Sequence, residues 1–264
     1  MTSRPDPASP SELPLPDSSA KTLRDFFWLL RAELFVLREE WFWYLLQASF
    51  VSLSYLAFLW FLIGPQAPSA AENLIVGSLV MSLSFAGMLS LGQHIGYLKE
   101  LQAFDYYAAL PLSKGAFIAA LTTRGMLLSL PATLLIGFLA VVFFHVPFTG
   151  LSVLILFLSA YAMAGFGALI GFYSPTAQVA GLLTQILQTV IIFFAPVYYH
   201  PSVLPEGLRL LAYLWPTTHA ALALKGSLGG GLNPSSLVSL FVLVLFCLVS
   251  LVLIPLRLDW RGRR

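Results

Sequence analysis

The feature that most constrains this chain is a stretch without Asp, Glu, Lys or Arg that runs from Gly125 to Pro205. A helix rises about 1.5 Å per residue and the hydrocarbon core of a bilayer is about 30 Å thick, so the stretch is too long for a single crossing. Turn-forming residues interrupt it at 145–150 and 173–176. The sequence therefore predicts three membrane spans here, near Ala116–Phe144, Leu151–Phe172 and Ala177–Ala195.

Three further apolar runs have the length of a span. Two of them, Trp41–Gly64 and Leu74–Leu98, contain no charged residue and are separated by a predicted outer loop at 65–73; the last runs from Ser236 to Leu256. Only 10% of the residues are charged, against about a quarter in soluble domains. We therefore expect an all-α integral membrane protein with six transmembrane helices. Its net charge of +2 gives no basic footprint for binding nucleic acid.

The basic residues predict the orientation, because cytoplasmic flanks retain Lys and Arg. Only Arg209 and Lys225 fall on the opposite side of the predicted spans. The other twelve of the fourteen share one side: Arg4, Lys21, Arg24, Arg31, Arg38, Lys99, Lys114, Arg124, Arg257, Arg261, Arg263 and Arg264. Both termini are therefore predicted to be cytoplasmic.

The segments outside the predicted six-span domain (41–256) differ in composition. Residues 1–20 are rich in proline and predict a disordered cytoplasmic tail, and 257–264 form a short basic tail. Residues 21–40 have the periodicity of an amphipathic interfacial helix, with a capping-box start at Thr22 and Asp25. This helix is interpreted as an anchor for the first span, with a lateral gate for a lipid-like substrate as the alternative.

A second amphipathic segment, Tyr97–Leu110, lies between the second and third spans and ends at Pro111. It could be a simple re-entry turn. However, it mixes aromatic and charged side chains, as protein interfaces do. Docking of a cytoplasmic partner is therefore the favoured interpretation, through Lys99, Glu100, Phe104, Asp105 and Tyr106.

The predicted spans contain no Asp, Glu or Lys at mid-membrane, where ion-coupled carriers usually place one. Arg124 is interpreted as a structural residue that snorkels to the headgroups. Uncharged polar side chains in the spans either line a translocation path or bond neighbouring helices; they are Gln47, Ser54, Tyr55, Gln185 and Gln188. Small residues four apart predict close helix packing; these pairs are Ala164 with Ala168 and Gly167 with Gly171.

The outer segment before the last span is rich in proline and aromatic residues. Its histidines, His200 and His219, are interpreted with Glu206 as ordinary interfacial residues rather than metal ligands, and no metal site is predicted. The residues that define the segment are Pro196, Tyr198, Tyr199, Pro201, Pro205, Trp215 and Pro216.

In the order of these elements the chain resembles the transmembrane subunit of a type-2 ABC exporter, the class that includes the daunorubicin-resistance and polysaccharide-export permeases. The surface helix, the segment Phe104–Ser113 with its Leu-Pro-Leu-Ser end, and the outer segments Ala195–Pro205 and Leu214–His219 carry the resemblance. It implies a cytoplasmic coupling helix between spans two and three and an extracellular re-entrant hairpin before span six.

The resemblance also implies the working assembly. Two such permease subunits, identical or different, would be driven by two copies of a separate cytoplasmic ABC ATPase in a bacterial cytoplasmic (inner) membrane, with ATP and Mg on the partner and no cofactor in this chain. The sequence has no G-x-x-x-x-G-K-[ST] phosphate loop, so no enzymatic activity is expected of the chain itself. The implied cargo is amphipathic or lipid-like: a drug, antibiotic, lipid or glycolipid. The alternative is a non-ABC membrane protein, either half of a secondary carrier or an assembly scaffold.

Overall fold

The computed structural model describes residues 18–63, 68–228, 231 and 233–258. Within these ranges every regular element is a helix. Six helices are long and apolar enough to cross a membrane: Trp41–Phe61, Ala71–Glu100, Lys114–Phe144, Gly150–Tyr173, Ala177–Phe194 and Pro234–Arg257. The predicted all-α fold with six spans is confirmed. Of the tails predicted over 1–20 and 257–264, residues 1–17 and 259–264 lie outside the described residues, whereas residues 18–20 belong to the first helix and Arg257 is the last residue of the last helix.

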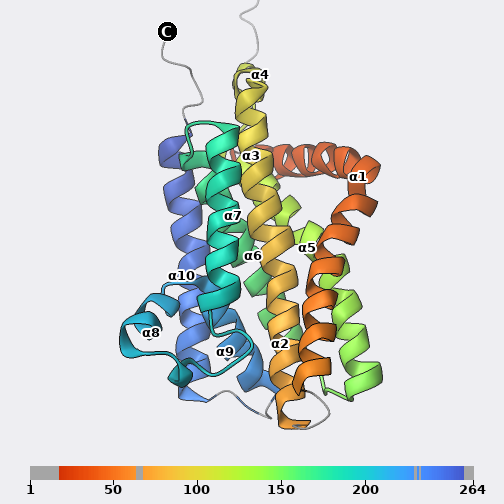
Figure 1. Cartoon of the computed structure of the whole chain (residues 1–264). Coiled ribbons are helices and arrows are strands. Elements are labelled where there is room, and N and C mark those ends of the chain that lie inside the picture. The colour runs from red at the N-terminus through yellow and green to blue at the C-terminus, as the bar shows by residue number, and fades with distance from the viewer. Residues whose placement is uncertain (1–17, 64–67, 229–230, 232, 259–264) are drawn as a thin grey trace, which may run out of the picture.

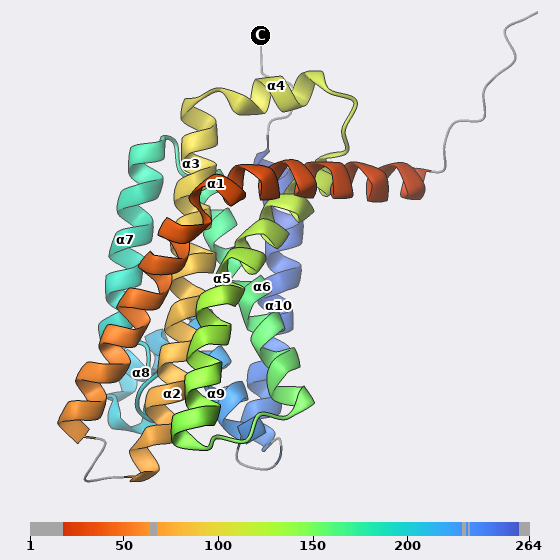
Figure 2. The same cartoon turned by 90° about the vertical axis from the view of Figure 1, so that its right-hand side faces the viewer.

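The first helix, α1 (Ser18–Ile63), joins the predicted interfacial helix and the first span without a break. Figures 1 and 2 show its first part lying across one end of the bundle and its second part running down beside α2 and α5. The charged part of the helix lies outside the apolar span because charge is costly in hydrocarbon. The helix begins before Lys21, so Thr22 and Asp25 are inside it and the predicted capping-box start is wrong.

The second span is built from three consecutive helical segments: α2 (Pro68–Leu83), the π-helical η2 (Ser84–Leu89) and α3 (Ser90–Glu100). They follow one another as a single rod in Figure 1 and form the most deeply buried of the six spans. Because α2 begins at Pro68, the loop predicted over 65–73 is too long. Proline is tolerated in the first turn of a helix, where its missing N–H costs no hydrogen bond.

The next three spans are α5 (Lys114–Phe144), α6 (Gly150–Tyr173) and α7 (Ala177–Phe194). Local polar contacts fix their boundaries: α5 ends at His145, whose φ of 55° is left-handed, and the Thr149 and Ser152 side chains form a capping box at the start of α6. The Thr176 hydroxyl accepts the Val179 N–H at 3.2 Å to start α7. The helix breaks predicted in the charge-free stretch are therefore confirmed.

The segment before the last span forms helices of its own. A 3₁₀ turn (Pro201–Val203) and α8 (Glu206–Ala212) precede α9 (Pro216–Leu228), and α10 (Pro234–Arg257) follows. The side chains of α8 are mostly exposed, whereas α9 is mostly buried and contacts α2, α6 and α10. Figures 1 and 2 place both at the end of the bundle opposite α4 (Ala103–Ala109).

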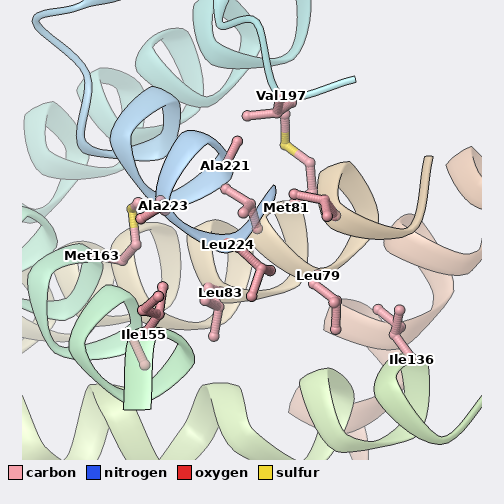
Figure 3. Packing of buried hydrophobic residues seen from close by; sticks show 14 of the residues in the cluster. Leu79, Met81, Leu83, Ile136, Ile155, Met163, Val197, Ala221, Ala223 and Leu224 are labelled. Carbon is pink, nitrogen blue, oxygen red and sulfur yellow. The ribbon is translucent and has the colours of Figure 1, made fainter. Parts of the chain in front are cut away.

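Two kinds of packing hold the bundle together. In Figure 3, buried residues of α9 pack against residues of the neighbouring spans, among them Ala221, Ala223, Leu224, Leu79, Leu83, Ile155 and Met163. Elsewhere the backbones approach closely: a Cβ added at Gly171 would lie 2.7 Å from Ile95 Cβ, and one added at Gly167 would overlap the Met88 backbone. The close-packing role predicted for Gly167 and Gly171 is confirmed.

Candidate functional site

The short helix α4 lies at the end of the bundle where the described chain begins and ends (Figures 1 and 2). The sequence predicted one helix over Tyr97–Leu110, and this is wrong. Residues 97–100 are the last turn of α3, and Gln102 then adopts a left-handed conformation with φ 53°. This residue turns the chain out of the α3 axis, so α4 lies across the bundle end as a separate element.

Aromatic rings attach α4 to the spans. The Phe104 ring centroid lies 5.9 Å from that of Phe117 on α5 and 5.6 Å from that of Phe172 on α6. The Tyr107 ring lies 4.8 Å from Phe117. Burial and the Glu33 carboxylate raise the pKa of Tyr107, so its hydroxyl is neutral at physiological pH. One face of α4 is thus packed against two spans at once.

The opposite face of α4 is open. Asp105 and Tyr106 are exposed, Tyr106 to 67%, and Glu100 is exposed at the end of α3. Lys99 instead turns toward the spans, where its ammonium donates to the carbonyls of Phe172 and Ser174, both at 2.6 Å. Of the five predicted partner-contact residues, Lys99 and Phe104 therefore face inward and the other three face outward.

The surface part of α1 docks on α5 through a face that the sequence analysis did not single out. Asp25, Leu29 and Glu33 follow one another at intervals of four residues and are all buried. The Asp25 carboxylate accepts the backbone N–H of Ser113 at 3.3 Å, next to the start of α5. Two acidic residues eight apart, on a helix whose arginines lie on another face, were the available signal in the sequence.

Glu33 is the centre of a buried polar cluster that joins α1, α3 and α5. Its Oε2 lies 3.1 Å from Arg124 Nε and 3.4 Å from His94 Nε2, and Arg124 is only 2% exposed. The contacts are electrostatic rather than aligned hydrogen bonds, because neither nitrogen meets hydrogen-bond geometry. The prediction that Arg124 snorkels to the headgroups is therefore wrong. The Glu33 carboxylate gives the charge of Arg124 a partner inside the bundle.

The five candidate path residues occupy different environments. Gln188 on α7 is buried and accepts the Ser84 hydroxyl of η2 at 2.8 Å, which is a packing role. Tyr55 is half-buried and stacks on Tyr198, with ring centroids 6.3 Å apart. The remaining three are exposed on the surface of the bundle, on the membrane-spanning parts of α1 and α7: Gln47, Ser54 and Gln185.

The hairpin before the last span comprises the 3₁₀ turn, α8 and α9, and Tyr198 and Lys225 anchor it. The Tyr198 ring lies against Gly77, where a Cβ would collide with it. The Lys225 ammonium donates to the Tyr199 carbonyl at 3.4 Å, and burial lowers the pKa of Lys225 to about 8 against the opposing effect of the Glu72 carboxylate. Side chains of Tyr198 and Lys225 thus attach the start of the hairpin to α9 and to the second span.

The histidines and prolines of this segment have local roles. His219 contacts the Tyr213 carbonyl at 2.8 Å, and His200 bonds Ser202. Trp215 packs edge-on against Phe166, and Pro216 begins α9. Glu206 pairs with Arg209 at 3.7 Å. His200, Glu206 and His219, the three side chains of this segment that could ligate a metal, therefore each contact a different partner.

Besides its spans, the fold has a surface helix that leads into the first span, a short helix between spans two and three that aromatic rings attach to the bundle, and a helical hairpin before the last span. Residues 24–228 match the family model of the ABC-2 type transporter, which includes all three elements. The chain belongs to the ABC-2 type transporter family. It is therefore an ABC-2 permease, a multi-pass membrane protein, and the non-ABC alternative is ruled out.

Membership of the ABC-2 family also indicates that transport and ATP hydrolysis belong to different subunits. The ABC-2 membrane domain is a transport component that lacks an ATPase domain of its own, so membership of the family implies an ABC ATPase subunit as the partner. A search of curated proteins finds no sequence that matches the permease.

Proposed function

We propose that this permease forms the translocation path of an ABC exporter for an amphipathic or lipid-like substrate, and that ATP-driven movement reaches it through α4. Two permease subunits, identical or different, and two ATPase subunits would make up the exporter. ATP and Mg²⁺ would bind to the ATPase subunits, and this chain would hold no cofactor. We place the assembly in a bacterial cytoplasmic (inner) membrane with both termini of the permease in the cytoplasm.

The observation that carries the proposal is the two-sided character of α4. Its outer face presents Asp105 and Tyr106 to a partner, and its inner face packs Phe104 and Tyr107 against α5 and α6. A force applied to the outer face of α4 is therefore transmitted directly to α5 and α6. Tightly packed helices respond to such a force by moving as rigid bodies.

The exposed polar side chains in the spans support a path beside α1 and α7. Polar side chains that face lipid find hydrogen-bond partners only within their own helix, and the amide of a glutamine is poorly satisfied there. Gln47, Ser54 and Gln185 are all exposed on this single chain. Contact with a second permease subunit or a hydrated substrate path between the two subunits would satisfy them.

The experiment measures ATP hydrolysis by the cognate ATPase subunit with and without the permease in lipid nanodiscs. The permease alone should hydrolyse no ATP, and the complex should hydrolyse it when transport substrate is present. Replacing both exposed carboxylates (Glu100→Ala with Asp105→Ala) should weaken binding of the ATPase subunit about ten-fold, since a few residues dominate most protein interfaces.

The matched control is Glu206→Ala. Glu206 is also an exposed carboxylate, but it lies at the opposite end of the bundle. This variant should bind the ATPase subunit as the unmodified chain does. Unchanged binding by the Glu100→Ala, Asp105→Ala double variant would show that the ATPase does not dock on α4 and the end of α3.

A further inference from the structure

A cavity of about 660 Å³ opens beneath α4 at the same end of the bundle. The ends of four spans and the start of α4 surround it, with Lys99 of α3, Lys114 of α5 and Arg257 of α10 in its wall. No carboxylate is among the described residues that line it. Three positive charges thus share one cavity, and an anion inside it would relieve their mutual repulsion.

The three cations keep donors available for a ligand. An ammonium has three N–H donors; Lys99 uses two of them on the Phe172 and Ser174 carbonyls, and Lys114 uses one on the Leu258 carbonyl at 3.3 Å. Arg257 is exposed and has no hydrogen bond or ion pair within the described ranges. Within the part of the chain that the structure describes, one donor of Lys99, two of Lys114 and the whole guanidinium of Arg257 are therefore available to a phosphate oxygen.

Two carboxylates of the described residues at this end of the bundle are directed elsewhere. Asp25 lies close to the start of α5, but it accepts the Ser113 N–H. Glu100 lines a separate hollow with Lys99 and the start of α7, not this cavity. The positive charge of the cavity is therefore not neutralised by these two side chains.

The rest of the wall favours a lipid over a soluble anion. Phe104, Phe172, Pro255 and Leu256 supply apolar surface beside the cations, and Leu256 is 75% exposed at the end of the last span. A phosphodiester seated among the cations would have its acyl chains directed past these residues into the cytoplasmic leaflet. Basic pockets between the cytoplasmic ends of spans bind acidic headgroups in this way.

We propose that this cavity binds the phosphate headgroup of an anionic phospholipid that is not transported. Because Phe104 belongs both to the cavity wall and to the contact between α4 and the spans, an occupied cavity stiffens the attachment of α4. The bound lipid thus supports coupling as a structural ligand of the permease. The binding step itself does not depend on the proposed export function, so it is tested without an ATPase or a substrate.

The test uses the full chain in a neutral detergent and measures binding of phosphatidylglycerol by native mass spectrometry, with phosphatidylcholine, a zwitterionic lipid of zero net charge, as the comparison. Arg257→Gln and Lys114→Gln should each weaken phosphatidylglycerol binding about five-fold, the effect of one surface cation on an acidic lipid. Phosphatidylcholine binding should not change. Arg257→Gln removes an exposed side chain without a described partner, so its folding is expected to be normal, which a melting curve checks.

The matched control is Arg24→Gln, which removes an exposed arginine from the surface part of α1, outside the cavity. An equal loss in Arg24→Gln would mean diffuse attraction to acidic lipid and would overturn the site. Tight binding of inorganic phosphate that displaces the lipid would assign the cavity to a soluble anion instead. If Arg257→Gln bound lipid normally but lost binding to the ATPase subunit, the cavity would belong to the protein interface and the proposal would fail.

Discussion

At the residue scale, Arg124 has a different environment from the one its sequence position suggests. It lies in the first turns of a long apolar helix, where a long basic side chain usually reaches the headgroups. In the folded chain it is buried against Glu33, which comes from a helix far away in the sequence. The contact between Arg124 and Glu33 thus joins α5 to α1, and the contact of Glu33 with His94 extends the cluster to α3.

Removing one partner of this cluster should destabilise the permease strongly, because the other charge stays buried without compensation. Arg124→Met is expected to lower the free energy of unfolding by about 3–5 kcal/mol, and adding Glu33→Gln should restore a large part of the loss. Unfolding in mixed micelles of increasing SDS content measures both. Additive losses in the double variant would mean that the two side chains do not interact; Arg38→Gln, at an exposed position of α1, is the neutral comparison.

Gln185 and Gln188 lie on the same helix, so variants of the two can distinguish helix packing from the translocation path that we propose. Gln188→Leu leaves the buried Ser84 hydroxyl without its acceptor and should cost about 1–3 kcal/mol of stability. Gln185→Leu changes an exposed side chain, so it should leave stability of the isolated subunit unchanged and lower substrate-stimulated ATP hydrolysis by the complex. Stability losses of the same size in both variants would place Gln185 in the packing as well.

At the scale of elements, the docking and transmission roles that we propose for α4 belong to opposite faces of the helix. Tyr106 is on its open face and Phe104 is on the face that packs against α5 and α6. Tyr106→Ala should weaken binding of the ATPase subunit, whereas Phe104→Ala should leave binding nearly intact and reduce transport per ATP hydrolysed. Binding and transport are measured on the same reconstituted complex. If Phe104→Ala lost binding as severely as Tyr106→Ala, the two faces would not have separate roles.

The spans could be predicted from sequence because each depends on its own composition: a long apolar run with turn residues or caps at its ends is sufficient. The division between α3 and α4 could not, because it depends on a single left-handed residue, Gln102, and nothing in that side chain demands such a conformation. The partners of Glu33, Arg124 and His94 were equally inaccessible, since a pairing across three helices requires the helices to be placed first. Local patterns therefore predicted elements, and tertiary contacts decided what the polar residues do.

At the scale of the whole molecule, the orientation in the membrane that we propose is based on the distribution of Lys and Arg, and it is open to a direct test. The sole cysteine, Cys247, is buried, so it should react slowly with a membrane-impermeant maleimide. In intact cells the reagent should label Glu206→Cys, and it should label Asp105→Cys only after permeabilisation. The opposite pattern would reverse the assignment of inside and outside without altering the fold.

The unbroken course of α1 has a mechanical consequence for the whole molecule. No glycine or proline occurs between Ser18 and Ile63, so the backbone has no ready pivot where the surface part meets the span. The helix has two arms at an angle to each other, and we expect the first to lie in the plane of the headgroups and the second to cross the hydrocarbon. We therefore expect the depth of the first arm in the headgroup region to set the tilt of the first span. A thinner or more curved bilayer would then change the tilt of that span.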